Sequence, residues 1–306
     1  MSAAPQPSVS DWLFVAALGV IWGASFMAVS VALDGQGPIW VAAARIALAA
    51  LALCLLAQLV GPGLPRLAGP QGARIWLFAA GMGVFSNALP FTLLAWGQQH
   101  VASGFAGITM AAVPLFTLGL AHFLVAGERL GGARVAGFLM GLAGVAVLIG
   151  PAALETRGVA AEGAARIACL MAAASYAVGS IVTRRCPPVA LMSLSAAALL
   201  VAALAMVPLA LLLEGVPRLQ MPLRSWGAVL YLGIGPTALA TLILVRVIRS
   251  AGPGFLSQVN YQVPVWSVIF GVMILGEDLP PQFLFALALI LGGLALSRAG
   301  PWRRRP

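Results

Sequence analysis

Ten apolar segments, each long enough to cross a lipid bilayer as a helix, account for most of this sequence. A spanning helix needs about 20 predominantly apolar residues, and it satisfies its own backbone because hydrocarbon offers no other hydrogen-bond partner. Charged residues make up only 8% of the chain, far below the roughly 25% of a soluble domain. The predicted fold is an all-α membrane protein with ten transmembrane helices, near residues 12–33, 38–60, 73–97, 103–126, 133–150, 164–184, 188–213, 224–247, 253–275 and 281–298.

The first segment is expected to remain in the mature protein. A secretory signal peptide begins with a basic region and has a short apolar core. Residues 1–11 contain no basic side chain, and the apolar run that follows them is long. The connections between segments are short, the longest being 151–166. We therefore expect a multi-pass protein of the plasma (inner) membrane that acts within the lipid bilayer.

The arginines predict how the chain is oriented. All seventeen basic residues are arginines, and an excess of such residues marks cytoplasmic loops. Twelve fall on one side of the ten-helix arrangement and four on the other, which places both termini in the cytoplasm and explains the net charge of +9 without a nucleic-acid partner. The predicted cytoplasmic set is Arg66, Arg74, Arg129, Arg134, Arg184, Arg185, Arg246, Arg249, Arg298, Arg303, Arg304 and Arg305, and the outer set is Arg157, Arg166, Arg218 and Arg224.

Two stretches about 150 residues apart share one pattern. "VPLFTLGLAHFLVAGERL" (113–130) and "VPVWSVIFGVMILGEDL" (263–279) each have a proline, an apolar filling and a Gly-Glu close. We infer a tandem duplication of five-helix units, 11–150 and 164–299. Because five is odd, the second unit crosses the membrane in the opposite direction. Inverted repeats of this kind place a substrate site near the midplane and let two faces open in turn.

The sequence resembles the EamA-type branch of the drug/metabolite transporter superfamily. The features that carry the resemblance, over about residues 11–299, are the ten-helix plan, "IWGASF" (21–26), Arg45 and the P…GE.L close of the fourth and ninth helices. The resemblance implies export of amino acids and related metabolites, and the chain is similar to the aromatic and neutral amino-acid exporters. It departs from the pattern in its second half, where "ASYAVGS" (174–180) replaces the WG motif and the seventh helix has no counterpart of Arg45.

Polar and aromatic side chains inside the spans are the candidate substrate-binding residues. The cluster "SQVNYQ" (257–262) is predicted inside the ninth helix. Because polar side chains facing lipid are costly, it is expected to face the bundle interior or a water-filled cavity. Helical spacing would place Gln258, Tyr261 and Gln262 on one side of that helix. The complete predicted substrate-binding set is Asn87, Gln258, Tyr261, Gln262, Ser257, Trp22, Tyr176 and Arg45.

Several residues within the predicted spans have a structural interpretation besides a functional one. Arg45 can anchor the second helix by pairing with helix-end carbonyls, which we favour over substrate contact. Trp22 and Tyr176 lie mid-helix at corresponding positions and suit core packing as well as an apolar substrate pocket. His122, the only histidine within a span, fits a packing role better than a proton relay.

Helix-breaking and helix-end residues are the candidate gating elements. Glu128 and Glu277 end helices, where a carboxylate opposes the helix dipole unless it reaches a partner such as the N-terminus of another helix. Prolines free backbone carbonyls and allow helices to bend. The predicted gating set is Pro90, Pro114, Pro236, Pro264, Glu128 and Glu277.

These features predict a secondary transporter that exports small neutral or zwitterionic metabolites, amino acids above all, by alternating access. The alternatives are an exporter of drugs or other metabolites, a proton-coupled antiporter, or a membrane channel or adaptor. An enzyme is not indicated, because no acid lies inside a predicted span and neither HExxH nor GxSxG occurs. The sequence indicates no cofactor and no metal site, and it leaves monomer and dimer open. Its partners would be a small-molecule substrate and the lipid bilayer.

Overall fold

The computed structural model describes residues 7–124, 132–149 and 160–299, and these fold as helices with no strand among them. Seven helical stretches in this part of the chain are long and apolar enough to cross a membrane, and three shorter apolar helices complete the ten predicted spans. The all-α membrane fold expected from the sequence is thus confirmed.

Five spans form each unit. Local sequence explains some of the starts, since Ser8 and Asp11 form a capping box at the first helix and Pro38 opens the second. The first unit contains α1 (Val9–Leu33), α2 (Pro38–Leu59), α3 (Gly72–Gly83) with η1 (Val84–Ala88) and α4 (Leu89–Gly97), α5 (Ser103–Thr109) with η2 (Met110–Ala112) and α6 (Val113–Leu124), and α7 (Gly132–Ile149). The second contains α8 (Ala160–Arg185), α9 (Leu191–Glu214), α10 (Leu223–Gly233) with η4 (Ile234–Leu239) and α11 (Ala240–Leu256), α12 (Val259–Leu275), and α13 (Pro281–Ala299).

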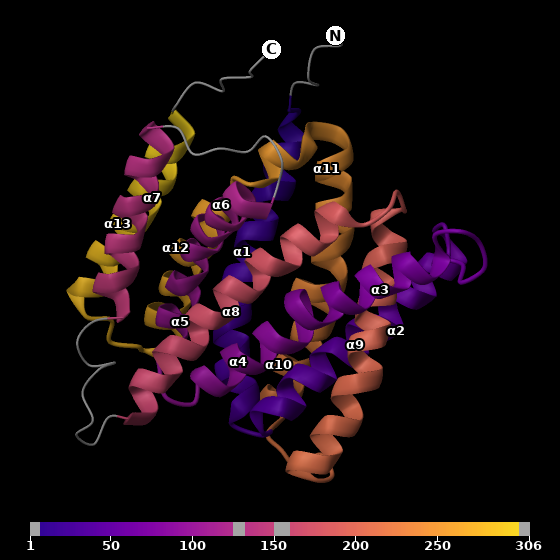
Figure 1. Cartoon of the computed structure of the whole chain (residues 1–306). Helices are drawn as coiled ribbons and strands as arrows, with labels where there is room; N and C mark the ends of the chain where they lie inside the picture. Colours follow the sequence, from indigo (N-terminus) through magenta and orange to yellow (C-terminus); the bar gives the residue numbers. More distant parts are fainter. Residues whose placement is uncertain (1–6, 125–131, 150–159, 300–306) are drawn as a thin grey trace, which may run out of the picture.

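The two units run in opposite directions. Figure 1 shows α1 descending from the upper end of the molecule and α8 rising from the lower end. The contacts between helices also come in corresponding pairs when the two units are exchanged. The α1–α12 contact corresponds to the α8–α6 contact, and the α3–α9 contact corresponds to the α10–α2 contact. We call the end where α1 begins and α13 ends the terminal end, and the opposite end the far end.

The third and eighth spans each contain a π-helical turn, η1 in one and η4 in the other. Pro90 is the second residue of α4, directly after η1, and Pro236 lies within η4. Proline has no N–H, so Pro236 leaves the Leu232 carbonyl without its α-helical donor. The Thr237 hydroxyl donates to that carbonyl instead, at 2.8 Å. The widened turn is therefore a consequence of the local sequence.

The fourth and ninth spans are interrupted ahead of a proline. Pro114 follows the 3₁₀ turn η2. The ninth span begins after Gly252, a non-helical residue near the end of α11 (φ 84°), and in it Pro264 follows a turn at Ser257 and Gln258 that separates α11 from α12. The expectation that 257–262 lies inside one continuous helix is therefore wrong, because α12 begins only at Val259. For Pro114, the carbonyl four residues earlier belongs to Met110, and the clash of the proline ring with that carbonyl favours the tighter turn η2.

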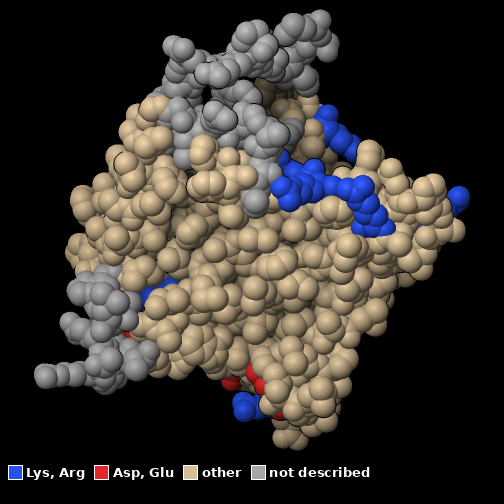
Figure 2. Space-filling model, in the orientation of Figure 1, with Lys and Arg blue, Asp and Glu red and all other residues tan. Residues whose placement is uncertain are grey.

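On the face that Figure 2 shows, the charged side chains lie mainly toward the two ends of the molecule. Figure 2 shows a flank almost free of them, with basic side chains gathered toward the upper, terminal end and carboxylates toward the lower, far end. An apolar flank between charged ends is the surface that a membrane-spanning protein presents to lipid. Which end faces the cytoplasm stays a prediction from the arginine distribution.

We expect the terminal end to be cytoplasmic, with residues 127–134 inside and residues 151–163 and 276–281 outside. The reason is the excess of arginine on the terminal side. Single cysteines introduced into a cysteine-free background can be labelled with a membrane-impermeant reagent in intact cells. Glu155→Cys should be labelled and Leu130→Cys should be protected, whereas labelling of Leu130→Cys from outside would contradict the orientation.

Candidate functional site

The two π-helical turns carry matching polar side chains. Asn87 in η1 donates from Nδ2 to Met82 O at 3.4 Å, and Thr237 in η4 donates to Leu232 O, in both cases to the carbonyl five residues earlier. Both side chains are buried. The bond recorded for Asn87 stays within its own helix and does not reach the 257–262 stretch. Because π-bulges occur frequently at functional sites, these turns mark the candidate functional region of the bundle.

Arg45 of α2 reaches the second of these turns. Its Nε donates to Thr237 Oγ1 at 2.8 Å, and its guanidinium carbon lies 3.7 Å from the centroid of the Phe91 ring in α4. Phe91 makes an edge contact with Tyr176 of α8, with ring centroids 6.5 Å apart. Arg45 is only 7% exposed. We call Arg45, Phe91, Tyr176 and Thr237 the Arg45 cluster; it brings a cation, a hydroxyl and two aromatic rings together from four spans.

Each π-helical turn also receives a hydrogen bond from the first helix of the other unit. Trp22 Nε1 of α1 donates to Pro236 O at 2.9 Å, and Ser175 Oγ of α8 donates to Phe85 O at 2.8 Å. Exchanging the two units maps the helices of one contact onto those of the other, with Trp22 corresponding to Tyr176, the neighbour of Ser175. Trp22 is therefore a link between the units, and its indole N–H is already engaged in this arrangement.

The predicted polar stretch of the ninth span lies against α1. Gln258 is the N-cap residue of α12, and Tyr261 lies in the first turn of that helix. Gln262 packs so closely on α1 that a Cβ added at Gly19 would lie 2.7 Å from its Oε1. Gln262 therefore lies in the contact between α12 and α1. Partial burial is shared by Ser257, Gln258, Tyr261 and Gln262.

Glycines let α1, α5 and α12 pack closely. A Cβ added at Gly23 of α1 would overlap Trp266 of α12, and one added at Gly107 of α5 would overlap the side chain of Ser267. Ser267 has no exposed surface. Small residues of this kind allow transmembrane helices to approach backbone to backbone. We call these four residues the glycine seam.

The Glu277 carboxylate caps the N-terminus of α5 at the far end. Oε1 accepts a hydrogen bond from Ser103 N–H at 2.6 Å, and Oε2 accepts one from Gly104 N–H at 2.9 Å. Gly276, with φ of 67°, ends α12 in the left-handed region and redirects the chain. A carboxylate suits the positive end of a helix dipole. The partner of Glu277 is thus the N-terminus of another helix, the kind of partner expected from the sequence. The gating role of Glu277 stays a prediction. Glu128 lies outside the described residues.

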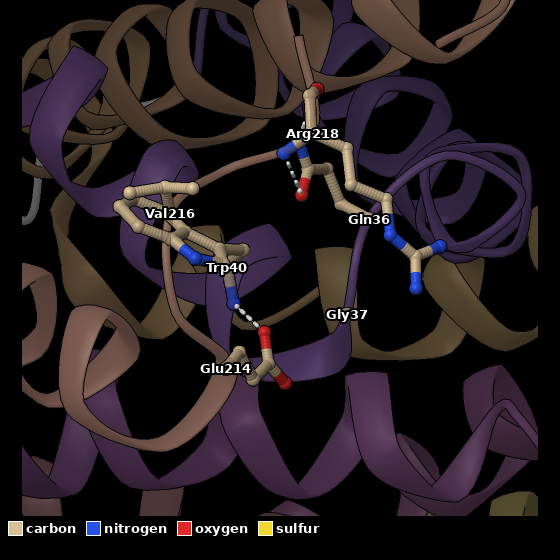
Figure 3. A pocket seen from close by; sticks show the side chains of 6 residues that line it. All are labelled: Gln36, Gly37, Trp40, Glu214, Val216 and Arg218. Atoms are coloured by element: carbon tan, nitrogen blue, oxygen red, sulfur yellow. Dashed lines mark hydrogen bonds between the residues drawn. The ribbon is translucent and has the colours of Figure 1, made fainter. Parts of the chain in front are cut away.

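A second carboxylate, which the sequence analysis did not single out, makes the same kind of contact. Glu214, the last residue of α9, accepts hydrogen bonds from the N–H groups of Ile39 and Trp40 in α2, each at 2.9 Å. Beside it Gln36 donates to Arg218 O at 2.8 Å. These side chains border a far-end pocket of about 280 Å³. Figure 3 shows the Glu214 carboxylate directed at the backbone nitrogen of Trp40. The pocket contains no residue of the Arg45 cluster.

Sequence reasoning missed Thr237, Phe91 and Glu214. The signal for Glu214 was present, because it is a carboxylate at the end of an apolar helix, as Glu277 is. Thr237 directly follows Pro236, and a hydroxyl there could have been expected to satisfy the carbonyl that the proline leaves free. Phe91 is one apolar residue among many, and its position carried no signal.

The chain matches the model of the EamA-like transporter family twice, over residues 11–150 and 161–299. "Uncharacterized inner membrane transporter YedA" of Escherichia coli K12 is 28% identical over 94% of this chain and 90% of that protein. "Probable terminal-alkyne amino-acid exporter" of Streptantibioticus cattleyicolor is 26% identical over 97% of this chain and 96% of that protein. A crystal structure with 25% sequence identity aligns with a TM-score of 0.65, covering 94% of this chain and 97% of the other.

Proposed function

Because the chain belongs to the EamA-like transporter family, we propose that it exports small neutral or zwitterionic metabolites, above all amino acids with aromatic or large apolar side chains. The observation that carries this proposal is the Arg45 cluster. Its cation and hydroxyl suit the polar end of an amino acid, and its aromatic rings suit an apolar side chain. The name of the relative from Streptantibioticus cattleyicolor supports the same substrate class.

Alternating access is the proposed mechanism, and the paired contacts of the two units support it. The α1–α12 contact and the α8–α6 contact exchange when the units are exchanged. Two arrangements would then be close in free energy: one is closed at the far end and open at the terminal end, and the other is the reverse. Glu277 is proposed to latch the far end when it is closed, and the interrupted spans would bend as the ends open.

The substrate proposal can be tested in cells and in liposomes. Overexpression should raise resistance to toxic aromatic and aliphatic amino-acid analogues, because an exporter lowers their internal concentration. In liposomes the purified protein should move phenylalanine and leucine. If it moves neither, but moves a phosphorylated sugar or a cationic dye, the substrate class is wrong while the transporter assignment stands.

Side chains that contact the polar end of the substrate should matter for transport more than for folding. Asn87→Ala, Gln258→Ala and Tyr261→Phe are each expected to raise KM about three- to tenfold, since a neutral hydrogen bond contributes roughly 0.5–1.5 kcal/mol. The measurement is initial uptake into liposomes, with thermal stability measured alongside. Variants that lose stability but keep their KM would assign these side chains to packing.

Transport is expected to run down the substrate gradient without proton coupling. Every acid of the sequence lies outside the predicted spans or at their ends, and His122 is the only histidine within one. Flux should therefore be the same with and without an imposed pH gradient at zero membrane potential. Uphill accumulation driven by the pH gradient, and abolished by His122→Ala or Glu277→Gln, would make the protein a proton-coupled antiporter.

A further inference from the structure

Arg45 is held in place by groups that do not neutralise it. Thr237 fixes Nε, and the Phe91 ring lies under the guanidinium plane. Arginine carries five N–H donors, and the bond to Thr237 uses one of them. The remaining donors sit on the two terminal nitrogens, which form the fork that binds a carboxylate in bidentate fashion.

The described residues provide no counter-ion for this charge. No carboxylate in residues 7–124, 132–149 and 160–299 lies within 4.0 Å of the Arg45 guanidinium. A second buried arginine shows the contrast: Arg166 also lies over a ring, Phe105, but it is paired with Glu162. Because an unpaired buried cation is costly, Arg45 is suited to a site whose anion arrives with the ligand.

The fold does not require an arginine at this place. A Cβ added at Gly233 would lie 2.6 Å from Leu48 Cβ and 3.3 Å from the Arg45 carbonyl oxygen, and one added at its counterpart Gly83 would lie 2.6 Å from the carbonyl oxygen of Ala198 in α9. Ala198 therefore occupies the position that corresponds to Arg45 in the other unit, and it packs there with no exposed surface. This position thus holds an alanine in one unit and an arginine in the other. Packing between the two helices therefore does not need the arginine charge.

We propose that Arg45 binds the carboxylate of the substrate and thereby limits the transported class to small carboxylates with an apolar or aromatic side chain. The carboxylate meets the terminal nitrogens of Arg45, and the side chain lies along Phe91 and Tyr176. This assignment rests on the proposed amino-acid export, which it narrows. Amines and amides that have the same side chain but no carboxylate are excluded.

The test is competition against phenylalanine uptake in liposomes by a matched set of compounds. 3-Phenylpropionate keeps the carboxylate and lacks the ammonium group, whereas phenylalaninamide and phenethylamine lack the carboxylate. The acid should compete, and the amide and the amine should be at least about tenfold weaker, because a charge-assisted bidentate pair is lost. Equal competition by the acid and the amide in the wild-type protein overturns the inference and leaves amino-acid export standing.

Variants separate recognition from anchoring. Arg45→Gln should raise KM for phenylalanine about 10- to 100-fold and abolish the preference for the acid over the amide. Arg45→Lys should keep a weaker preference, because lysine retains the charge without the fork. Arg166→Gln, the matched control, should leave KM unchanged. If Arg45 were purely structural, Arg45→Gln would lower the stability and the maximal rate but keep the KM and the preference for the acid. That result would overturn the inference.

Two contingencies also lead to a decision. If Arg45→Gln does not fold, the wild-type competition series and Arg45→Lys decide the matter. If the wild-type protein moves no amino acid, the proposed function fails, and thermal shifts with 3-phenylpropionate, 4-methylvalerate and their amides take over. A shift produced by the acids alone and lost in Arg45→Lys or Arg45→Gln sustains carboxylate recognition; no acid-specific shift overturns it.

Discussion

Replacing Gly107 by alanine is expected to lower transport about tenfold or more and to lower thermal stability in detergent. A Cβ at this position would overlap the buried side chain of Ser267 in the glycine seam. Overpacking costs about 1–3 kcal/mol, and it falls only on the arrangement in which α5 touches α12. Since about 1.4 kcal/mol changes an equilibrium tenfold, closure of the far end would become the rare state. The measurements are initial uptake in liposomes and the melting temperature.

A compensating change makes this prediction specific. Gly107→Ala combined with Ser267→Gly removes the overlapping side chain, so transport should recover at least partly, as expected for two residues in direct contact. Gly227→Ala in α10 is the matched control, because a Cβ there meets nothing within 4 Å. Wild-type transport by Gly107→Ala would show that close packing of α5 on α12 is not needed.

Glu277→Gln is expected to reduce turnover about tenfold. The amide keeps the shape of the side chain, but it loses the charge and places an NH₂ group against one of the two N–H groups of α5. Hydrogen bonds to charged groups contribute about 1.5–3 kcal/mol each. The closed far end would therefore lose the contact that the latch provides. Initial rates at saturating substrate measure the effect.

Glu214→Gln is the matched comparison, since it makes the same atomic change in the same kind of cap. The α2–α9 contact maps onto itself when the units are exchanged, so it has no need to open during transport. Glu214→Gln should lower stability and leave turnover nearly unchanged. If both variants lose turnover equally, or if Glu277→Gln loses only stability, Glu277 is a structural cap and not a gate.

The spans could be predicted because hydrocarbon leaves a chain few choices. A long apolar segment becomes a helix whatever its detailed sequence, so the ten spans followed from segment length. The irregular turns could not be predicted in the same way. One extra residue in η1 or η4 changes no hydrophobic pattern, and neither a proline nor a glycine stands at the interruption at Ser257 and Gln258.

The types of residue that form the candidate site could be predicted from the sequence, but the contacts between them could not. Arg45 and Tyr176 were recognised because charges and mid-span aromatics are unusual in a membrane. Their connection through Phe91 was not, because contacts between distant spans depend on helix rotation, which an apolar sequence hardly encodes. Helix-dipole physics indicated that Glu277 needs a helix N-terminus, but it could not identify α5 among the possible partners.

Counterflow tests the central claim, that this chain carries amino acids by alternating access, most directly. Liposomes containing the purified protein are loaded with unlabelled phenylalanine and diluted into a trace of labelled phenylalanine. A carrier whose site faces one side at a time should accumulate label transiently above the external level, with rates that saturate as external phenylalanine rises. Label that only equilibrates, without overshoot or saturation, would indicate a channel and contradict the account.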